Sequence, residues 1–268
     1  MIINFIMRGG RTMIDIHCHI LPGIDDGSKD LDSSIQMINT AVNAGTKKFI
    51  VTPHFYWGQY ENDYLSVTKH LEKLNAEILK RQMPIEIYPG QEIFVDRHTL
   101  GFIKEGAIRG LNDSKYLLIE FPMDVLPKDA FDIIYELKIL GFKPILAHPE
   151  RYVYVINNPS EINKFINEGC LIQINAGSIT GLFGSKIEQT ALTLIEHNVC
   201  QFIASDAHST GKRNTDLTEV LTLMKKSYGR LYGKILVNGQ NVIDNKEIST
   251  NMRFIQEKKG LFSRMFGK

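Results

Sequence analysis

Short apolar runs of strand length recur along this chain and alternate with longer stretches that have helical spacing. The strand-sized runs are rich in β-branched residues and occupy residues 14–18, 49–52, 85–88, 116–119, 144–147, 171–174 and 202–204. The stretches with helical spacing occupy residues 35–42, 71–79, 131–139, 187–197 and 217–228. Such alternation predicts parallel βαβ units, and seven strands are more than a flavodoxin-like sheet needs. We therefore expect an α/β fold whose strands close into a TIM-like barrel.

Glycines and the absence of linkers support a single domain. Gly45, Gly141 and Gly169 each stand where a helix would end before the next strand begins. No repeat, low-complexity tract or Pro/Ser-rich linker divides the 268 residues. We expect the domain to span residues 13–250, with residues 1–12 as an upstream extension outside the fold and residues 251–268 as a C-terminal tail.

Charge, cysteine content and hydropathy exclude several classes of protein. The formal net charge of +1 provides no global field for a polyanion, so nucleic acid is not expected as a partner. The 3 cysteines lack any CxxC pair, which favours a reducing compartment, and we expect a cytoplasmic protein. No apolar run approaches the roughly 18 residues of a membrane span. Residues 1–7 are too short for a signal peptide's apolar region.

Metal-ligating side chains gather where the predicted strands end. In barrels these ends and the loops after them converge on one face, which carries the active site. His17 and His19 project from the same side of the first strand because side chains alternate with period two. The residues at or just beyond the predicted strand ends are His17, His19, Thr52, His54, Gln91, Glu92, Glu120, His148, Asn175, Asp206 and His208.

Mixed imidazole and carboxylate ligands predict a hydrolytic metal site. Glu92 and Glu120 each follow an apolar strand, where a carboxylate needs a cation or a basic partner such as Arg151. Several converging carboxylates would repel one another, which favours two or three ions over one. Ligands without thiolate suit Mn, Fe, Zn or Mg. His70, His98 and His197 fall in helical or loop stretches and are excluded from the site.

Two arginines indicate the group on which the site acts. Arg151 and Arg213 each follow a candidate ligand by a few residues, and guanidinium groups match phosphate oxygens bidentately. A surface arginine in a loop salt bridge is an equal alternative for either residue alone, but the pair favours phosphate. No cysteine heads a Cys-x5-Arg loop, because Ile24, Ala176 and Asp206 occupy the arginine position.

Together these segments resemble the PHP (polymerase and histidinol phosphatase) superfamily and, within it, the bacterial tyrosine-protein phosphatases of capsule and exopolysaccharide operons. The resemblance runs from Met13 to about Val242. Its most telling segments are residues 13–22 with 25–27, 90–93, 118–122, 147–151 and 204–208.

The resemblance implies a distorted (β/α)7 barrel of the PHP type and a trinuclear site that usually holds Mn²⁺, with Mg²⁺, Fe, Co²⁺ or Zn²⁺ as substitutes. One implied ion has His17, His19, Glu92 and Asp206 as ligands. Glu92 bridges to a second ion near Glu120 and His148, and Asp26, His54, Glu120 and His208 surround the third. Asp26 would otherwise be read as part of an Asp25-Asp26-Gly27 turn. His148, Arg151 and Arg213 are the implied catalytic residues.

The implied substrate is phosphotyrosine on the C-terminal tail of the bacterial tyrosine kinase that regulates polysaccharide export. Rival enzymes that would use the same metal ligands are a histidinol-phosphate phosphatase, a nucleotide phosphatase and a 3′-end nuclease. A metal-stabilised adaptor without turnover is a third reading.

Two further segments carry weaker hypotheses. The aromatic stretch 55–60 either grips a substrate ring or packs over the barrel mouth. Residues 258–268 are expected by default to form a disordered tail. They also mix cations with large apolar groups, as interfacial segments do, which gives the weaker hypothesis of a peripheral membrane or partner contact.

Overall fold

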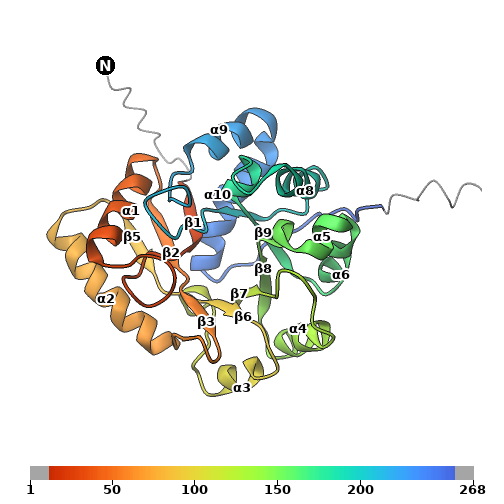
Figure 1. Ribbon diagram of the computed structural model, residues 1–268, viewed down its shortest axis with the longest axis horizontal. Coiled ribbons are helices and arrows are strands. Elements are labelled where there is room, and N and C mark those ends of the chain that lie inside the picture. The colour runs from red at the N-terminus through yellow and green to blue at the C-terminus, as the bar shows by residue number, and fades with distance from the viewer. Residues whose placement is uncertain (1–11, 257–268) are drawn as a thin grey trace, which may run out of the picture.

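A computed structural model describes residues 12–256 and shows parallel strands at the centre with helices around them (Figure 1). The strands are β1 (Ile14–Cys18), β2 (Lys48–Val51), β3 (His54–Tyr56), β4 (Tyr60–Glu61), β5 (Glu86–Tyr88), β6 (Glu92–Phe94), β7 (Tyr116–Glu120), β8 (Lys143–Ala147), β9 (Leu171–Asn175) and β10 (Phe202–Ala204). The helices are α1 (Leu31–Asn43), α2 (Tyr64–Lys80), α3 (Thr99–Lys104), α4 (Ala130–Ile139), α5 (Val153–Asn157), α6 (Ile162–Asn167), α7 (Ala176–Ile179), α8 (Ser185–Glu196), α9 (Thr218–Ser227) and α10 (Gly229–Ile243). Three 3₁₀ turns complete the described elements: η1 (Leu111–Asp113), η2 (Pro149–Arg151) and η3 (Pro159–Glu161).

Two hydrogen-bonded sheets form successive parts of one barrel. One has the order β1-β2-β5 and the other the order β10-β9-β8-β7-β6-β3-β4. The chain runs directly from β2 into β3 and from β5 into β6, so each pair is a single barrel position that is broken once. The ends of β1 and β10 meet through a parallel bridge between Cys18 and Ala207, and the Asp206 N–H donates to the His17 carbonyl over 2.9 Å. Seven positions therefore close, and the predicted distorted barrel is confirmed.

Both strand breaks have a local chemical cause. Pro53 lacks an N–H for the ladder, so the second position cannot continue as a regular strand. At the third position the break falls at Gly90, where a Cβ would meet Leu111 Cδ2 at 2.7 Å and Ile50 Cγ2 at 2.8 Å. Beyond the breaks, β3 and β6 pair in register so that His54 lies opposite Glu92. The breaks thus bring these two side chains together.

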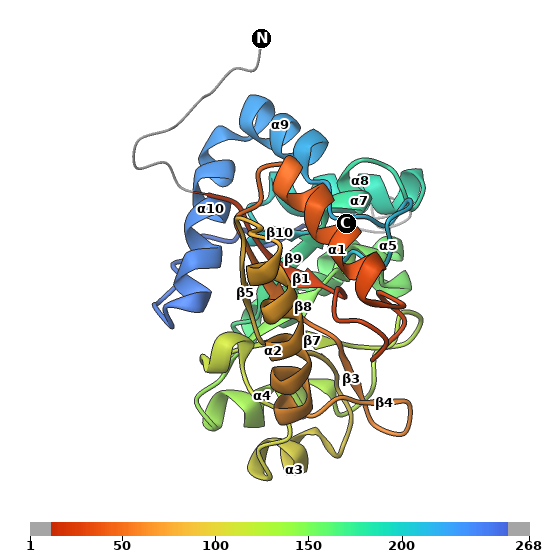
Figure 2. The ribbon, with the colours of Figure 1, turned by 90° about the vertical axis from the view of Figure 1, so that its left-hand side faces the viewer.

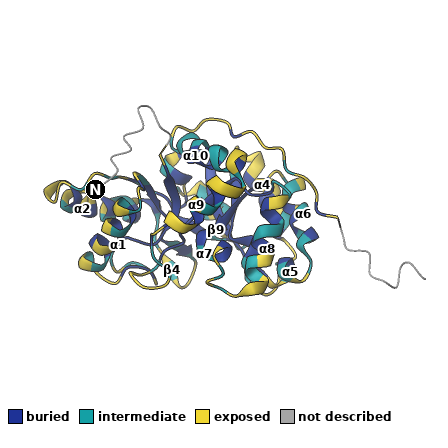
Figure 3. Ribbon diagram, turned by 90° about the horizontal axis from the view of Figure 1, so that it is seen from above, coloured by how far each residue is buried: buried dark blue, intermediate teal, exposed yellow. Residues whose placement is uncertain are grey.

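Apolar residues pack both inside the barrel and between the strands and the helices. Ile16, Ile50 and Leu118 belong to a buried cluster that Val242 of α10 joins. A second cluster holds Cys18 against α1 and α2, which cover one side of the barrel (Figure 2). Strands β1, β7, β9 and β10 are buried at every residue, whereas the helices carry exposed residues on their outer faces (Figure 3). This core fixes the strand ends that carry the polar residues.

The predicted elements largely match the observed ones. Each predicted strand overlaps an observed strand, and Gly45, Gly141 and Gly169 adopt φ values of 92°, 89° and 77°, as helix-ending glycines do. The sequence prediction missed β3, β4 and β6, the short helices α3, α5, α6 and α7, and α10. No helix among residues 12–256 is long and apolar enough to cross a membrane.

The first residues of the proposed tail pack on the domain. The Arg253 N–H donates to the His197 carbonyl over 3.0 Å, and Ile255 exchanges two backbone hydrogen bonds with the Asn163 side chain. Ile255 is buried. The domain boundaries at 12 and 250 stay predictions. Residues 1–11 and the segment 257–268, which includes the whole predicted interfacial stretch 258–268, lie outside the described residues.

Candidate metal centre

All nine predicted metal-ligating side chains lie at the carboxyl ends of the barrel strands. His17 lies on β1, and His19 and Asp26 lie on the loop that follows it. His54 and Glu92 are the first residues of β3 and β6. The others end or follow the later strands: Glu120 on β7, His148 after β8, and Asp206 and His208 after β10.

Glu92 lies at the middle of this group. Its Oε2 is 3.2 Å from His17 Nε2, 3.2 Å from His19 Nε2 and 3.1 Å from His54 Nδ1, and its Oε1 is 3.0 Å from His148 Nε2. Oε1 forms a hydrogen bond with His148 Nε2, whereas Oε2 is fully buried and none of its three contacts has the geometry of a hydrogen bond. A buried carboxylate oxygen surrounded by imidazole nitrogens fits a shared divalent cation, which would satisfy all of them.

Three overlapping sets of side chains have ligand atoms within 4.8 Å of one another: His17, His19 and Glu92; His54, Glu92 and Glu120; and His19, Asp26, His54 and His208. The third set contains His19 where the resemblance implied Glu120. His19 Nδ1 is occupied by the Asp25 carboxylate at 2.8 Å, so only His19 Nε2 is left for an ion. Because one imidazole nitrogen binds one ion, His19 can serve only one of its two sets.

Asp206 connects the candidate ligands to both predicted arginines. Its Oδ1 is 3.4 Å from His17 Nε2. Its Oδ2 accepts hydrogen bonds from Arg151 Nη1 at 3.1 Å, Arg213 Nη2 at 2.8 Å and Asn175 Nδ2 at 2.6 Å. The two guanidinium groups therefore lie at the edge of the ligand group, where they can reach an anion bound there.

Two of these residues adopt backbone conformations that L-residues seldom use. His148 has a φ of 34° and Asp206 a φ of 50°. Such strain persists only where surrounding contacts enforce it, and it is often found at functional sites. Here it turns both side chains inward immediately after their strands.

Burial and mutual charge shift the pKa values of the site strongly. Burial lowers the pKa of His17, but the carboxylates of Glu92 and Asp206 outweigh it and raise the value to about 9. Burial and the neighbouring Glu92 raise the pKa of Glu120 to about 8. Burial lowers the pKa of His148 to about 4 against the pull of Glu92, so His148 is a neutral imidazole at pH 7 and is ready to act as a ligand.

A cavity of about 220 Å³ opens over these side chains. All candidate ligands except His17 and His19 line it together with Arg151 and Arg213, and Tyr56, Tyr60, Phe94 and Met123 form another part of the lining. Tyr56 and Phe94 stack with their ring centroids 4.1 Å apart. Within the stretch 55–60, Tyr56 and Tyr60 line the cavity while Trp57 packs against Phe102, and a role in gripping a substrate ring stays a prediction.

Comparison with known proteins decides the family. Residues 13–244 match the family described as capsular polysaccharide synthesis, CpsB/CapC. This chain belongs to the CpsB/CapC family. It is 40% identical over 217 residues to tyrosine-protein phosphatase YwqE of Bacillus subtilis (strain 168), covering 81% of this chain and 85% of that protein. It is 38% identical over 240 residues to the putative tyrosine-protein phosphatase CapC of Staphylococcus aureus, covering 88% of this chain and 93% of that protein.

Solved structures agree with the family assignment. A structure described with YwqE from Bacillus subtilis and CpsB from Streptococcus pneumoniae as unique metal-dependent tyrosine phosphatases aligns with a TM-score of 0.87 and 36% identity. The alignment covers 91% of this chain and 100% of that chain. An amidohydrolase from Mycoplasma synoviae aligns with a TM-score of 0.57 at 11% identity, covering 95% of this chain and 93% of that chain, a likeness of fold alone. The resemblance stated from the sequence is confirmed.

In this CpsB/CapC protein, several residues that sequence reasoning missed orient the ligand imidazoles. Asp25 Oδ2 lies 2.8 Å from His19 Nδ1, and Gln173 Oε1 lies 2.8 Å from His17 Nδ1. Such partners fix the ring orientation and the tautomer of a ligating histidine. Gln173 could have been found from the sequence, because it lies two residues before the strand end at Asn175 and its side chain therefore faces the same side of the strand as Asn175.

Gly27 is required by the loop that carries Asp25 and Asp26. A Cβ at this position would meet the His19 carbonyl oxygen at 2.3 Å, so only glycine allows the loop to fold back over β1. The Gly27 N–H also donates to Asp25 Oδ1 over 2.9 Å. The Asp-Asp-Gly turn and the candidate ligand Asp26 are therefore parts of one feature.

The three excluded histidines lie away from the CpsB/CapC site. His70 in α2 and His197 after α8 each contact a backbone carbonyl one turn earlier, those of Ser66 and Thr193. His98 precedes α3 on the surface. Among the described residues none of the three belongs to a candidate ligand set or lines the cavity over the ligands.

Proposed function

We propose that this chain is a metal-dependent protein-tyrosine phosphatase. The observation that carries the proposal is the single cavity in which two arginines flank a group of His, Asp and Glu ligands below an aromatic wall. An aryl phosphate needs all three: cations and guanidinium groups for the phosphoryl oxygens and an apolar surface for the ring. The names of the relatives YwqE and CapC support the same activity.

His17, His19, Asp26, His54, Glu92, Glu120, His148, Asp206 and His208 are the proposed ligands of three Mn²⁺ ions, for which Mg²⁺, Fe, Co²⁺ or Zn²⁺ can substitute. Bound ions of this kind supply a hydroxide nucleophile near neutral pH and neutralise phosphoryl charge. Arg151 and Arg213 bind the phosphoryl oxygens and orient phosphorus for in-line attack. The stacked Tyr56 and Phe94 hold the ring while tyrosinate, a fair leaving group, departs.

We place this phosphatase in the cytoplasm, and its proposed biological substrate is the phosphotyrosine-bearing C-terminal tail of a bacterial tyrosine kinase that controls capsule or exopolysaccharide synthesis. The family's link to capsular polysaccharide synthesis supports this choice. Incubation of the purified protein with a phosphorylated kinase tail should release phosphate in a Mn²⁺-dependent manner. A tail that keeps its phosphate while a synthetic phosphotyrosine peptide loses it would show that the partner is a different protein.

Direct assays separate the proposed activity from its rivals. Phosphotyrosine peptide, histidinol phosphate, a nucleotide and single-stranded DNA are compared with Mn²⁺ present and after chelation. The peptide should be the preferred substrate, and turnover of any of the other three alone would overturn the proposal. A protein that binds the peptide without turnover would be an adaptor. His148→Ala should lose metal and activity together, and full activity in a metal-depleted H148A would contradict the proposed site.

A further inference from the structure

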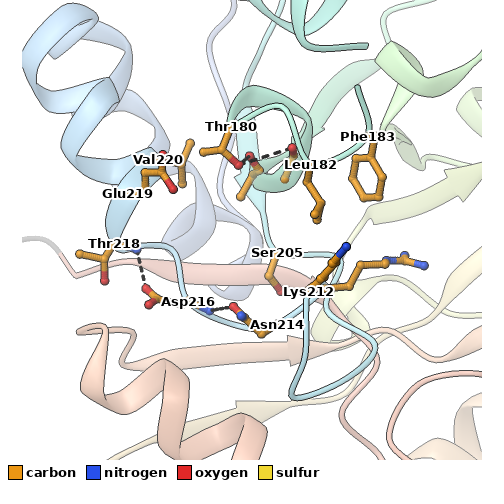
Figure 4. A pocket seen from close by; sticks show the side chains of 13 residues that line it. Thr180, Leu182, Phe183, Ser205, Lys212, Asn214, Asp216, Thr218, Glu219 and Val220 are labelled. Carbon is orange, nitrogen blue, oxygen red and sulfur yellow. Dashed lines mark hydrogen bonds between the residues drawn. The ribbon is translucent and has the colours of Figure 1, made fainter. Parts of the chain in front are cut away.

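A second cavity of about 520 Å³ adjoins the candidate metal centre (Figure 4). It lies between α7 with the loop that follows it and the segment that leads from β10 into α9. Arg213 lines both cavities. Phe183 lines the second one, and its ring lies under the Arg151 guanidinium, 4.9 Å from Arg151 Cζ to the ring centroid. The two arginines thus stand between the two cavities.

The second cavity has opposite charges at its two ends. Lys212 and Phe183 lie at the end beside Arg213, whereas Asp216 and Glu219 lie at the far end (Figure 4). Lys212 and Glu219 are exposed, and neither forms an ion pair with any residue among 12–256. In the part of the chain that the structure describes, Asp216 Oδ1 accepts a single hydrogen bond, from the Thr218 N–H at 2.8 Å. Free charges of opposite sign at opposite ends favour a ligand whose charges run in the complementary order.

The volume of the catalytic cavity limits what it can hold. A space of about 220 Å³ is smaller than ordinary ligand pockets of roughly 300–1,000 Å³, and it accommodates a phosphoryl group and a ring but no adjoining residues. The chain that bears the phosphotyrosine must therefore continue outside this space. The second cavity falls in the ordinary range and opens at the arginine that would bind the phosphate.

We infer that this second cavity binds the polypeptide that flanks the phosphotyrosine, an inference that rests on the proposed function. Lys212 pairs with an acidic residue next to the phosphotyrosine, Leu182 and Phe183 contact apolar atoms, and Asp216 with Glu219 pairs with a lysine or arginine a few residues further out. The cavity therefore selects substrates by the order of their charges and not by their net charge.

Binding of matched peptides tests this order directly. Two fluorescent peptides of identical composition carry a non-hydrolysable phosphonodifluoromethyl-phenylalanine in place of phosphotyrosine. One has an acidic residue beside it and a lysine two to four residues away, and the other has the two charges exchanged. Each peptide is made in two versions, one with the charged residues on the N-terminal side of the analogue and one with them on the C-terminal side. The first order should bind roughly threefold to tenfold more tightly by fluorescence anisotropy, as expected for exposed charge pairs.

Glu219→Lys should abolish most of this preference, because the far end then carries one anion, Asp216, and one cation, while Lys212 keeps the near end positive. The control Glu72→Lys makes the same charge change on the exposed side of α2 and should leave the preference unchanged. Circular dichroism checks that E219K folds. Lys212→Glu is the second variant, used if E219K does not fold, and it should weaken binding of the peptide with the first charge order. Equal affinity of wild type for both orders, within twofold, or equal effects of E219K and E72K would overturn the inference.

Hydrolysis of p-nitrophenyl phosphate separates this inference from the proposed function. The substrate fits the catalytic cavity alone, so E219K should hydrolyse it at the wild-type rate. Hydrolysis without any peptide preference would overturn the inference and leave the function intact. A peptide preference that is lost in E219K, in a protein that hydrolyses no aryl phosphate, would uphold the cavity's role and reject the function.

Discussion

The barrel has two unlike arcs, which deliver functional residues in different ways. In the continuous arc, from β7 to β10, each strand runs unbroken and the polar residue ends or follows it, as with Glu120 and His148. In the broken arc, β2 with β3 and β5 with β6, each position is interrupted and the functional residue begins the second segment, as with His54 and Glu92. An interruption therefore moves a ligand from the rim towards the middle of the group.

The contacts of the two glutamates show what this difference does. Glu92, from the broken arc, lies within 3.2 Å of four imidazoles, whereas Glu120, from the continuous arc, has one imidazole contact at 3.5 Å. The broken arc thus provides the centre of the site, and the continuous arc provides its edge together with both arginines.

Glu92→Gln should have the largest effect of any single substitution. It removes the charge that faces four imidazoles, and we expect kcat on a phosphotyrosine peptide to fall on the order of 10³-fold, about 4 kcal/mol of activation free energy. Bound metal, measured by elemental analysis, should fall with it. Glu120→Gln makes the same change on the continuous arc and should cost only about tenfold, or about 1.4 kcal/mol. Equal losses in the two variants would abolish the distinction between the arcs.

The arginines test the continuous arc separately from the metal ligands. Arg213→Lys and Arg151→Lys keep the charge but lose the bidentate fork, and each should lower kcat/KM about a hundredfold, or about 2.7 kcal/mol. Metal content should stay at the wild-type value. Arg230→Lys, on the exposed start of α10, is the matched control. Metal loss in R213K or R151K would show that these arginines hold the metal-ligating side chains together and do not bind phosphate.

Asp25→Asn probes the loop between the two arcs. Asp25 fixes His19 and accepts the His54 N–H at 3.2 Å, so its loss should weaken metal binding about 10- to 100-fold. Titration of the metal-free protein with Mn²⁺ measures this affinity. Saturating Mn²⁺ should restore most of the activity, and Asp32→Asn on the surface of α1 should behave as wild type. A D25N variant that binds Mn²⁺ normally would remove Asp25 from the site.

Glu150→Gln should change stability and not chemistry. Burial raises the pKa of Glu150 from 4.5 to about 7, so the unfolded chain loses this proton at lower pH than the folded chain. Stability is therefore lost as pH rises from about 4.5 to 7, by at most about 3 kcal/mol at 1.36 kcal/mol per pKa unit.

Urea unfolding of wild type and E150Q at pH 5, 6, 7 and 8 measures this loss, with the two proteins at equal metal content. The difference in unfolding free energy between them should shift in favour of E150Q as pH rises, and a constant difference would contradict the assignment. The difference in stability at a single pH is not informative, because the new amide adds an N–H donor where Glu150 Oε2 has no hydrogen-bond partner among residues 12–256. The change of this difference with pH is the quantity that tests the assignment.

The continuous arc was largely predictable from sequence, whereas in the broken arc the sequence predicted β2, β5 and the ligands His54 and Glu92 but not the second segments β3 and β6. Buried parallel strands read as apolar runs, and their carboxyl ends must meet, so Glu120, His148 and Asp206 could be placed together by topology alone. The segments β3 and β6 have 3 residues each and no alternation to reveal them. Asp26 needed the family resemblance, since its fold-back over β1 depends on a loop that local patterning describes only as a turn.

The packing of the three cysteines has a consequence for oxidative stress. Cys18, Cys170 and Cys200 are buried, and burial raises the pKa of Cys170 to about 12 and that of Cys18 well above its ordinary value. Peroxides and electrophiles attack the thiolate, which these residues do not offer. A phosphatase built on this barrel would therefore keep working through an oxidative burst that silences enzymes with a nucleophilic cysteine.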